Sequence, residues 1–157
     1  MTAGAVERAY QFIKERDLAN LKEVVDILKS QNLDVYISGS AIMVPDYSDI
    51  DLLICDPGFI VQGAANENDF KMSPRAQTAI DNIVNQEGVT LKKKEHDYGG
   101  GYMGSVIHGC RWEFNYKGSP IDISYAQEPG GLTREKIAKL EAEVGGDLGL
   151  VPDYEKF

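Results

Sequence analysis

Three aspartates set among apolar residues have the clearest potential for chemistry. Asp49 and Asp51 flank Ile50, and Asp122 stands between two isoleucines. Alternate residues of a β-strand share one face, so Asp49 and Asp51 would point away from a core that Ile50 enters. Neighbouring carboxylates repel one another unless a cation lies between them. Because Mg²⁺ prefers carboxylate and phosphate oxygens, the spacing predicts a magnesium site beside a phosphate-containing ligand, although Asp-x-Asp alone also fits an exposed strand edge.

Gly39 and Ser40 form a second motif, directly after the predicted strand 34–38. A glycine lets the backbone approach a phosphate closely, and a serine hydroxyl with the free amides of a helix start can donate to an anion. An ordinary strand-to-helix turn can have the same residues. Asp122 would be costly to bury without an opposing charge, and if its strand lies beside the strand 49–55, the three aspartates form a cluster able to hold two metal ions.

The elements that must position these residues follow from apolar spacing and turn residues. Helical spacing predicts an N-terminal helix over residues 5–30, continuous or broken in two, and a C-terminal helix over 132–144. Ser73 and Pro74 predict the cap and first turn of a helix that runs to Gly88. The predicted strands cover residues 34–38, 49–55, 89–95, about 102–116 with an interruption near Gly109, and 121–125.

This order of elements predicts an α+β fold: a mixed β-sheet flanked by helices on one side. The 157 residues suit a single domain, 1–157, whose motifs lie in a core from about 33 to 125. Trp112, Phe114 and Tyr116 would share one strand face, as part of the core or as a wall for a nucleotide base.

Composition narrows the class of partner. A formal charge of −9 argues against a protein that wraps nucleic acid, because phosphate binding of that kind needs a basic surface. Two cysteines are too few for a disulfide framework, which favours a reducing cytoplasm. The charges scattered through the first residues do not fit a secretory signal or a membrane span.

Taken together, the runs Ile-Ser-Gly-Ser, Ser-Asp-Ile-Asp-Leu-Leu and Ile-Asp-Ile resemble the three-part signature of the polymerase-beta-like nucleotidyltransferases. The resemblance implies the palm-like fold of that superfamily. It also implies that Gly39 and Ser40 hold the β- and γ-phosphates of a nucleoside triphosphate, with ATP favoured. Asp49 and Asp51 would bind the ions that bridge the triphosphate, and Asp122 would bind the catalytic ion and help deprotonate the acceptor. Two Mg²⁺ ions are expected, with Mn²⁺ as an alternative.

Two departures from that signature bear on activity. The spacer 41–48 is shorter than the family leads us to expect, and Ala41-Ile42-Met43 stands where many small members have a basic residue. The triphosphate contacts must then come from elsewhere in the chain. Arg111, Arg134 and Lys136 are the candidates, and the sequence does not choose among them.

The function implied by the resemblance is transfer of a nucleoside monophosphate from a triphosphate to a hydroxyl, with release of pyrophosphate. The acceptor would be a small molecule or a protein, and the acidic charge ranks a nucleic-acid end lowest. A homodimer or a partner protein would complete the acceptor pocket. The alternatives are a non-catalytic binding module of the same fold, such as an antitoxin-like partner, and a nucleotide sensor that binds without turnover.

Overall fold

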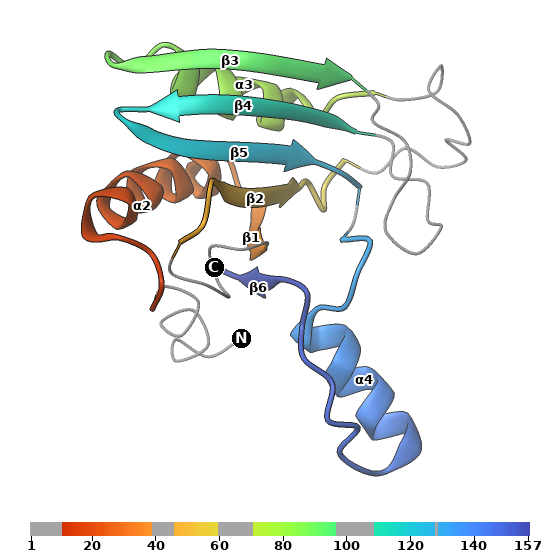
Figure 1. Ribbon diagram of the computed structural model, residues 1–157. Coiled ribbons are helices and arrows are strands. Elements are labelled where there is room, and N and C mark those ends of the chain that lie inside the picture. Colours follow the sequence, from red (N-terminus) through yellow and green to blue (C-terminus); the bar gives the residue numbers. More distant parts are fainter. Residues whose placement is uncertain (1–10, 39–45, 60–70, 97–108, 128) are drawn as a thin grey trace.

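The computed structural model describes residues 11–38, 46–59, 71–96, 109–127 and 129–157. Within these residues one six-stranded sheet has the order β3-β4-β5-β2-β1-β6 (Figure 1). The elements are α2 (Glu15–Ser30), β1 (Asp34–Ser38), β2 (Ile50–Cys55), α3 (Pro74–Val84), β3 (Val89–His96), β4 (Cys110–Tyr116), β5 (Ser119–Tyr125), α4 (Arg134–Val144) and β6 (Glu155–Lys156). β2 and β5 pair in parallel, and every other neighbouring pair is antiparallel. The α+β class and the mixed sheet are therefore confirmed.

α2 and α3 cover one face of the sheet and form the main core with it. Leu21 and Val24 of α2 and Ile80 of α3 are buried together with Ile50 and Ile123 of the central strands. α3 begins as expected, because the Ser73 side chain accepts a hydrogen bond from the backbone N–H of Ala76. The predicted helical cover on one side of the sheet is thus formed by α2 and α3.

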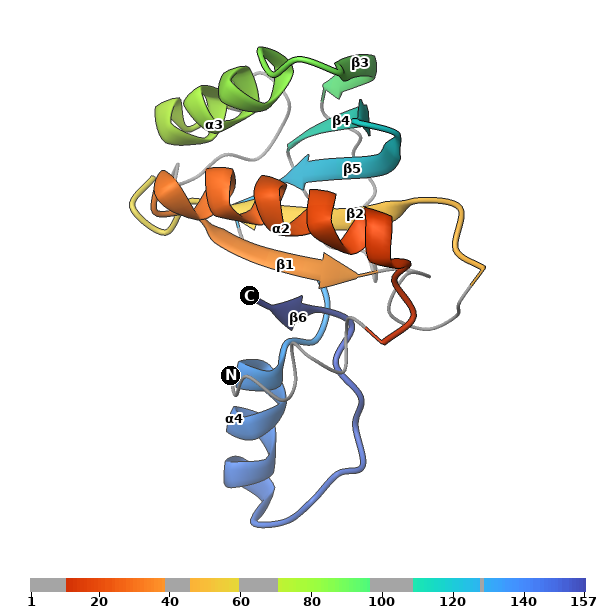
Figure 2. The ribbon, with the colours of Figure 1, turned by 90° about the vertical axis from the view of Figure 1, so that its left-hand side faces the viewer.

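The C-terminal helix departs from the expected arrangement. In both views α4 projects beyond β6, away from α2 and α3 (Figures 1 and 2). Ile137 is the one residue of α4 that is buried. α4 therefore does not flank the sheet, because it lacks the broad apolar face that packing on a sheet requires. The chain after α4 returns to the sheet through β6, a two-residue strand beside β1 that the sequence did not predict.

β4 begins where Gly109 meets the neighbouring strand. A Cβ atom on Gly109 would lie 1.9 Å from the carbonyl oxygen of Tyr125, so this position requires a glycine. Beyond it, Trp112, Phe114 and Tyr116 are each at most 1 % exposed and belong to the main core. The interpretation of these aromatic residues as core is confirmed, and they form no wall for a base. No helix in the described part of the chain has the length and apolar character to cross a membrane.

Candidate metal centre

Asp51 and Asp122 lie directly beside each other on the two parallel central strands. The register pairs Asp51 of β2 with Asp122 of β5, and the residues before them, Ile50 and Ile121, are also paired. Both isoleucines are fully buried in the main core, so alternation along each strand turns the two aspartates to the opposite face. The sequence prediction that these strands are neighbours is confirmed.

Asp49 completes the cluster from the residue immediately before β2. One carboxylate oxygen from each of Asp49, Asp51 and Asp122 lies within 4.8 Å of the others. Asp122 is 5 % exposed, whereas Asp49 and Asp51 are half-buried. The structure therefore brings together all three aspartates that the sequence singled out. Such an all-oxygen donor set, open on one side, suits a hard divalent cation.

The aspartates belong to a polar row that crosses the sheet on the face opposite α2 and α3. Residues that pair directly across neighbouring strands present their side chains on the same face. The row consists of Ser38, Asp51, Asp122, Glu113 and Lys93, one from each of five strands. A helix lying over this row would bury its charges, so a charged ligand can approach the row where none of the described helices covers it. Part of the same face is closed by a small buried cluster of Tyr36, Leu53, Cys55 and Ala126.

Arg111 contacts this carboxylate cluster from β4. Its Nη2 atom lies 2.9 Å from Oδ2 of Asp122 and 3.4 Å from Oε1 of Glu113. The Arg111 side chain is 32 % exposed and that of Asp122 is 8 % exposed, so the guanidinium lies at the solvent side of the buried carboxylate. Of the three basic residues proposed to contact a triphosphate, Arg111 is thus placed at the aspartates.

The electrostatics of the cluster favour a bound cation. Burial, followed by the nearby charges of Asp49 and Asp122, raises the pKa of Asp51 to about 6. Burial also raises the pKa of Asp122, and the hydrogen bond from Arg111 opposes this rise without cancelling it. A single guanidinium therefore leaves negative charge that the protein does not compensate. A divalent ion would relieve this repulsion and keep the carboxylates ionised.

A buried hydrogen-bond network fixes the segment that leads into Asp49. The Tyr47 hydroxyl donates to Oδ2 of Asp17 at 2.5 Å and accepts from the Lys14 N–H at 3.1 Å. Asp17 is 2 % exposed and also accepts from the Ser119 hydroxyl at 2.5 Å. The network joins the start of α2, the start of β5 and the residue two positions before Asp49. Sequence reasoning missed it, since no local pattern pairs Tyr47 with Asp17.

A small cavity of about 210 Å³ adjoins the cluster on the same face. It is lined by Ser38, Asp51, Leu52, Leu53, Arg111, Ser124 and Tyr154. Tyr154 comes from the segment just before β6, and its ring meets that of Tyr36 edge-on with 6.2 Å between the ring centroids. The C-terminal segment therefore supplies one wall of the space beside Asp51.

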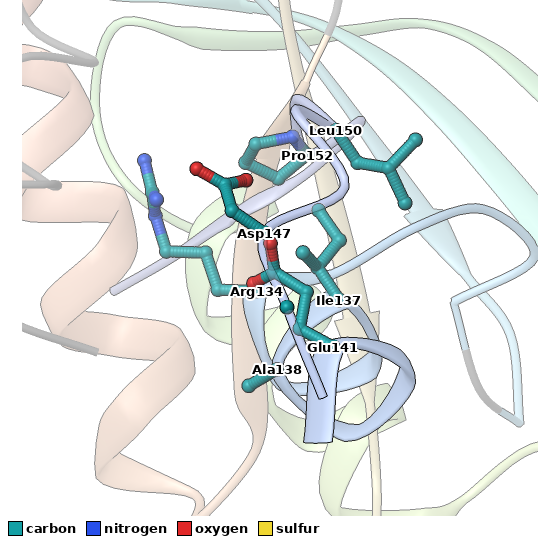
Figure 3. A pocket seen from close by; sticks show the side chains of 8 residues that line it. Arg134, Ile137, Ala138, Glu141, Asp147, Leu150 and Pro152 are labelled. Atoms are coloured by element: carbon teal, nitrogen blue, oxygen red, sulfur yellow. The ribbon is translucent and has the colours of Figure 1, made fainter. Parts of the chain in front are cut away.

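A larger hollow of about 660 Å³ lies elsewhere, between α4 and the segment that follows it (Figure 3). Its lining shares no residue with the aspartate cluster or the small cavity. Arg134 lines this hollow and binds both carboxylate oxygens of Glu155, at 2.9 and 2.7 Å. Lys136 donates to the carbonyl oxygens of Pro129 and Gly131. Both side chains are thus engaged at α4, which leaves Arg111 as the candidate triphosphate contact.

Several predicted features lie outside the described residues. These are Gly39, Ser40, the spacer up to position 45, residues 5–10 of the predicted N-terminal helix and residues 102–108 of the predicted strand. The phosphate-binding role assigned to Gly39 and Ser40 therefore stays a prediction. The last described residue before them is Ser38, whose register partner is Asp51. The strand that leads to the Gly-Ser motif therefore ends beside the carboxylates.

The chain matches no family model, no curated protein and no solved structure in the comparisons made.

Proposed function

We propose that the chain is a metal-dependent nucleotidyltransferase, which transfers a nucleoside monophosphate from a nucleoside triphosphate to a hydroxyl. The single observation that supports this most is the convergence of Asp49, Asp51 and Asp122 within 4.8 Å, on the face of the sheet opposite α2 and α3. A three-carboxylate site of this kind is able to hold two ions against the phosphates of a triphosphate.

When bound, magnesium would neutralise the phosphate charge and favour in-line displacement at the α-phosphorus. In that reaction the acceptor oxygen forms a bond to the α-phosphorus, the bond from this phosphorus to the β-bridging oxygen breaks, and pyrophosphate leaves. Asp49 and Asp51 would hold the triphosphate side of the site. Asp122, on the parallel strand, would lie nearer the acceptor and receive its proton. Arg111 would supply the basic group that is missing after Ser40.

The substrate classes follow from the same surface. The formal charge of −9 disfavours a long nucleic-acid acceptor, so a small molecule or a protein hydroxyl is the proposed acceptor. The cavity of about 210 Å³ is small for a complete acceptor site. A second copy or a partner protein would then complete it.

A non-catalytic binding module is the second candidate, and the ion pair between Arg111 and Asp122 favours it. Arg111 partly neutralises Asp122, the most buried aspartate of the cluster, so an internal cation already helps the fold to tolerate that residue. A binding module or a nucleotide sensor would keep this arrangement without releasing pyrophosphate.

The test compares the wild type with Asp49→Asn/Asp51→Asn. Thermal unfolding is followed with ATP or GTP, in the presence and absence of Mg²⁺, and pyrophosphate release is then measured with hydroxyl acceptors. We expect a magnesium-dependent rise in Tm that the double variant loses. Nucleotide binding without pyrophosphate release would support the sensor, and no stabilisation by millimolar triphosphate would support the binding module.

A further inference from the structure

Arg111 and a divalent cation would compete for the negative charge of the same carboxylate, Asp122. Asp122 accepts from Nη2 of Arg111 at 2.9 Å, and one of its oxygens also belongs to the three-aspartate cluster. One carboxylate can bind both partners, but a guanidinium and a divalent ion that contact the same carboxylate repel each other. Occupation of the cluster by an ion therefore weakens the hold of Asp122 on Arg111.

Arg111 has other carboxylates nearby besides Asp122. Glu113 lies 3.4 Å from the guanidinium on the same strand, and Asp51 lines the same cavity. Lys93 is the basic residue of the polar row itself, and it pairs with Glu95 at 2.5 Å. Among the described residues of that row and cavity, Arg111 is the basic group in direct contact with the cluster.

The guanidinium is also suited to bind the triphosphate that would accompany the ions. Its planar fork of N–H donors matches phosphate oxygens as well as it matches a carboxylate. The side chain is 32 % exposed and lines the cavity beside Asp51, so it can turn towards a ligand without breaking the core. A triphosphate brought in by the ions would offer it a stronger anion than the carboxylate it leaves.

We propose that Arg111 is an exchangeable cation: it pairs with Asp122 while the site lacks ions, and binds the polyphosphate once ions occupy the carboxylates. This inference rests on the proposed function and assigns a substrate-positioning residue to it. Arg111 would then lower the affinity of the site for the ion alone and raise its affinity for the ion–triphosphate complex. A purely structural ion pair would not have these two opposite effects.

The experiment measures two affinities in Arg111→Gln and Arg111→Lys. Binding of Mn²⁺ alone is followed by electron paramagnetic resonance, and binding of ATP with saturating Mg²⁺ by calorimetry. For Arg111→Gln we expect Mn²⁺ to bind roughly fivefold more tightly, because a nearby positive charge is gone. We expect ATP to bind about tenfold more weakly, because a charged hydrogen-bond donor is lost. Arg111→Lys should lie between the wild type and Arg111→Gln in both measurements.

Lys93→Gln is the matched control, because it removes the same charge from the same face without touching an aspartate. It should change both affinities less than twofold. Parallel losses of Mn²⁺ and ATP affinity in Arg111→Gln, or no change in either, would overturn the inference. If Mn²⁺ binds more tightly to Arg111→Gln but ATP binds to neither protein, the proposed function and the phosphate role fail while the competition stands. If neither Mn²⁺ nor ATP binds to any variant, both proposals are wrong.

Discussion

The buried carboxylates of the protein differ in their hydrogen-bond partners and in the direction of their pKa shifts. This difference distinguishes the candidate site from carboxylates that only stabilise the fold. Asp56, which follows β2, is 1 % exposed and accepts hydrogen bonds from Ser73, from Arg75 and from the Gly58 N–H. Burial alone would raise the pKa of Asp56, but these donors outweigh it and lower the pKa. Asp51, on β2 itself, has its pKa raised to about 6. The protein therefore gives the ionised Asp51 too few hydrogen-bond donors and positive charges to balance its burial. A metal ligand needs this uncompensated negative charge.

This contrast predicts that Asp51→Asn stabilises the metal-free protein. The pKa of Asp51 is about 6 in the folded chain against 3.8 for the free group, so the folded state binds the proton more tightly. The free energy of unfolding should therefore fall as the pH rises from about 4 to about 6, by up to about 3 kcal/mol. Asp51→Asn should remove this loss and also abolish stabilisation by Mg²⁺.

Urea denaturation in EDTA at pH 5 and pH 7.5 measures this effect. Asp56→Asn, directly after the same strand, is the control, and it should lose about 1 to 3 kcal/mol at both pH values because it disrupts the hydrogen bonds of a buried, satisfied carboxylate. A fall in stability of Asp51→Asn at pH 7.5 would contradict the idea that the wild-type carboxylate is under-compensated.

At the scale of elements, the sequence predicts which face the aspartates occupy but not the details of their setting. Alternation around Ile50 and around Asp122 directs the carboxylates away from the core, and this local rule predicts their face. The cluster itself also requires the parallel pairing of β2 with β5. The choice of Arg111 over Arg134 and Lys136 depends on which strands are neighbours, and long-range pairing decides that. β6 escaped prediction for the same reason, since two residues beside β1 have no periodicity of their own.

The segment that enters β2 is held by tertiary hydrogen bonds, so Tyr47→Phe should disturb the metal site from a distance. The variant keeps the ring but loses the donor to Asp17, a buried charged acceptor, which should cost about 1 to 3 kcal/mol of stability. Mn²⁺ affinity should fall as well, because Asp49 follows two residues later and loses its anchor.

Tyr116→Phe is the matched control for this experiment. Its hydroxyl also donates to a carboxylate, Oε1 of Glu23 at 3.0 Å, but it lies in the core away from the three aspartates. The control should lose some stability and leave Mn²⁺ affinity unchanged. Equal effects of the two variants on Mn²⁺ affinity would show that the network around Asp17 stabilises the fold without positioning Asp49.

At the scale of the whole molecule, the C-terminal part reaches back from α4 to the candidate site. The segment after α4 exposes Leu148, Leu150 and Val151, the last of them at 79 %. It then joins β1 through β6 and sets Tyr154 against the cavity beside Asp51. The wall of that cavity therefore depends on how firmly the two-residue strand is held. The paired contacts of Arg134 with Glu155 tie α4 to this strand.

Arg134→Gln should therefore loosen the C-terminal segment while leaving the aspartate cluster intact. The ion pair is partly exposed, so its loss should lower global stability by no more than about 1 kcal/mol. Local opening should be more sensitive than global stability, because β6 is a two-residue strand at the edge of the sheet. Hydrogen exchange should then be faster at the amide of Phe157, which donates to the carbonyl of Val35 at 2.9 Å, but not in β2 or β5.

Lys139→Gln, on the exposed side of α4, is the control and should leave exchange at Phe157 unchanged. Mn²⁺ affinity should stay at its wild-type value in both variants, since neither side chain contacts an aspartate of the cluster. Faster exchange throughout the sheet would instead mean that α4 and β6 are part of the cooperative core, and the cavity wall would then be as rigid as the strands beneath it.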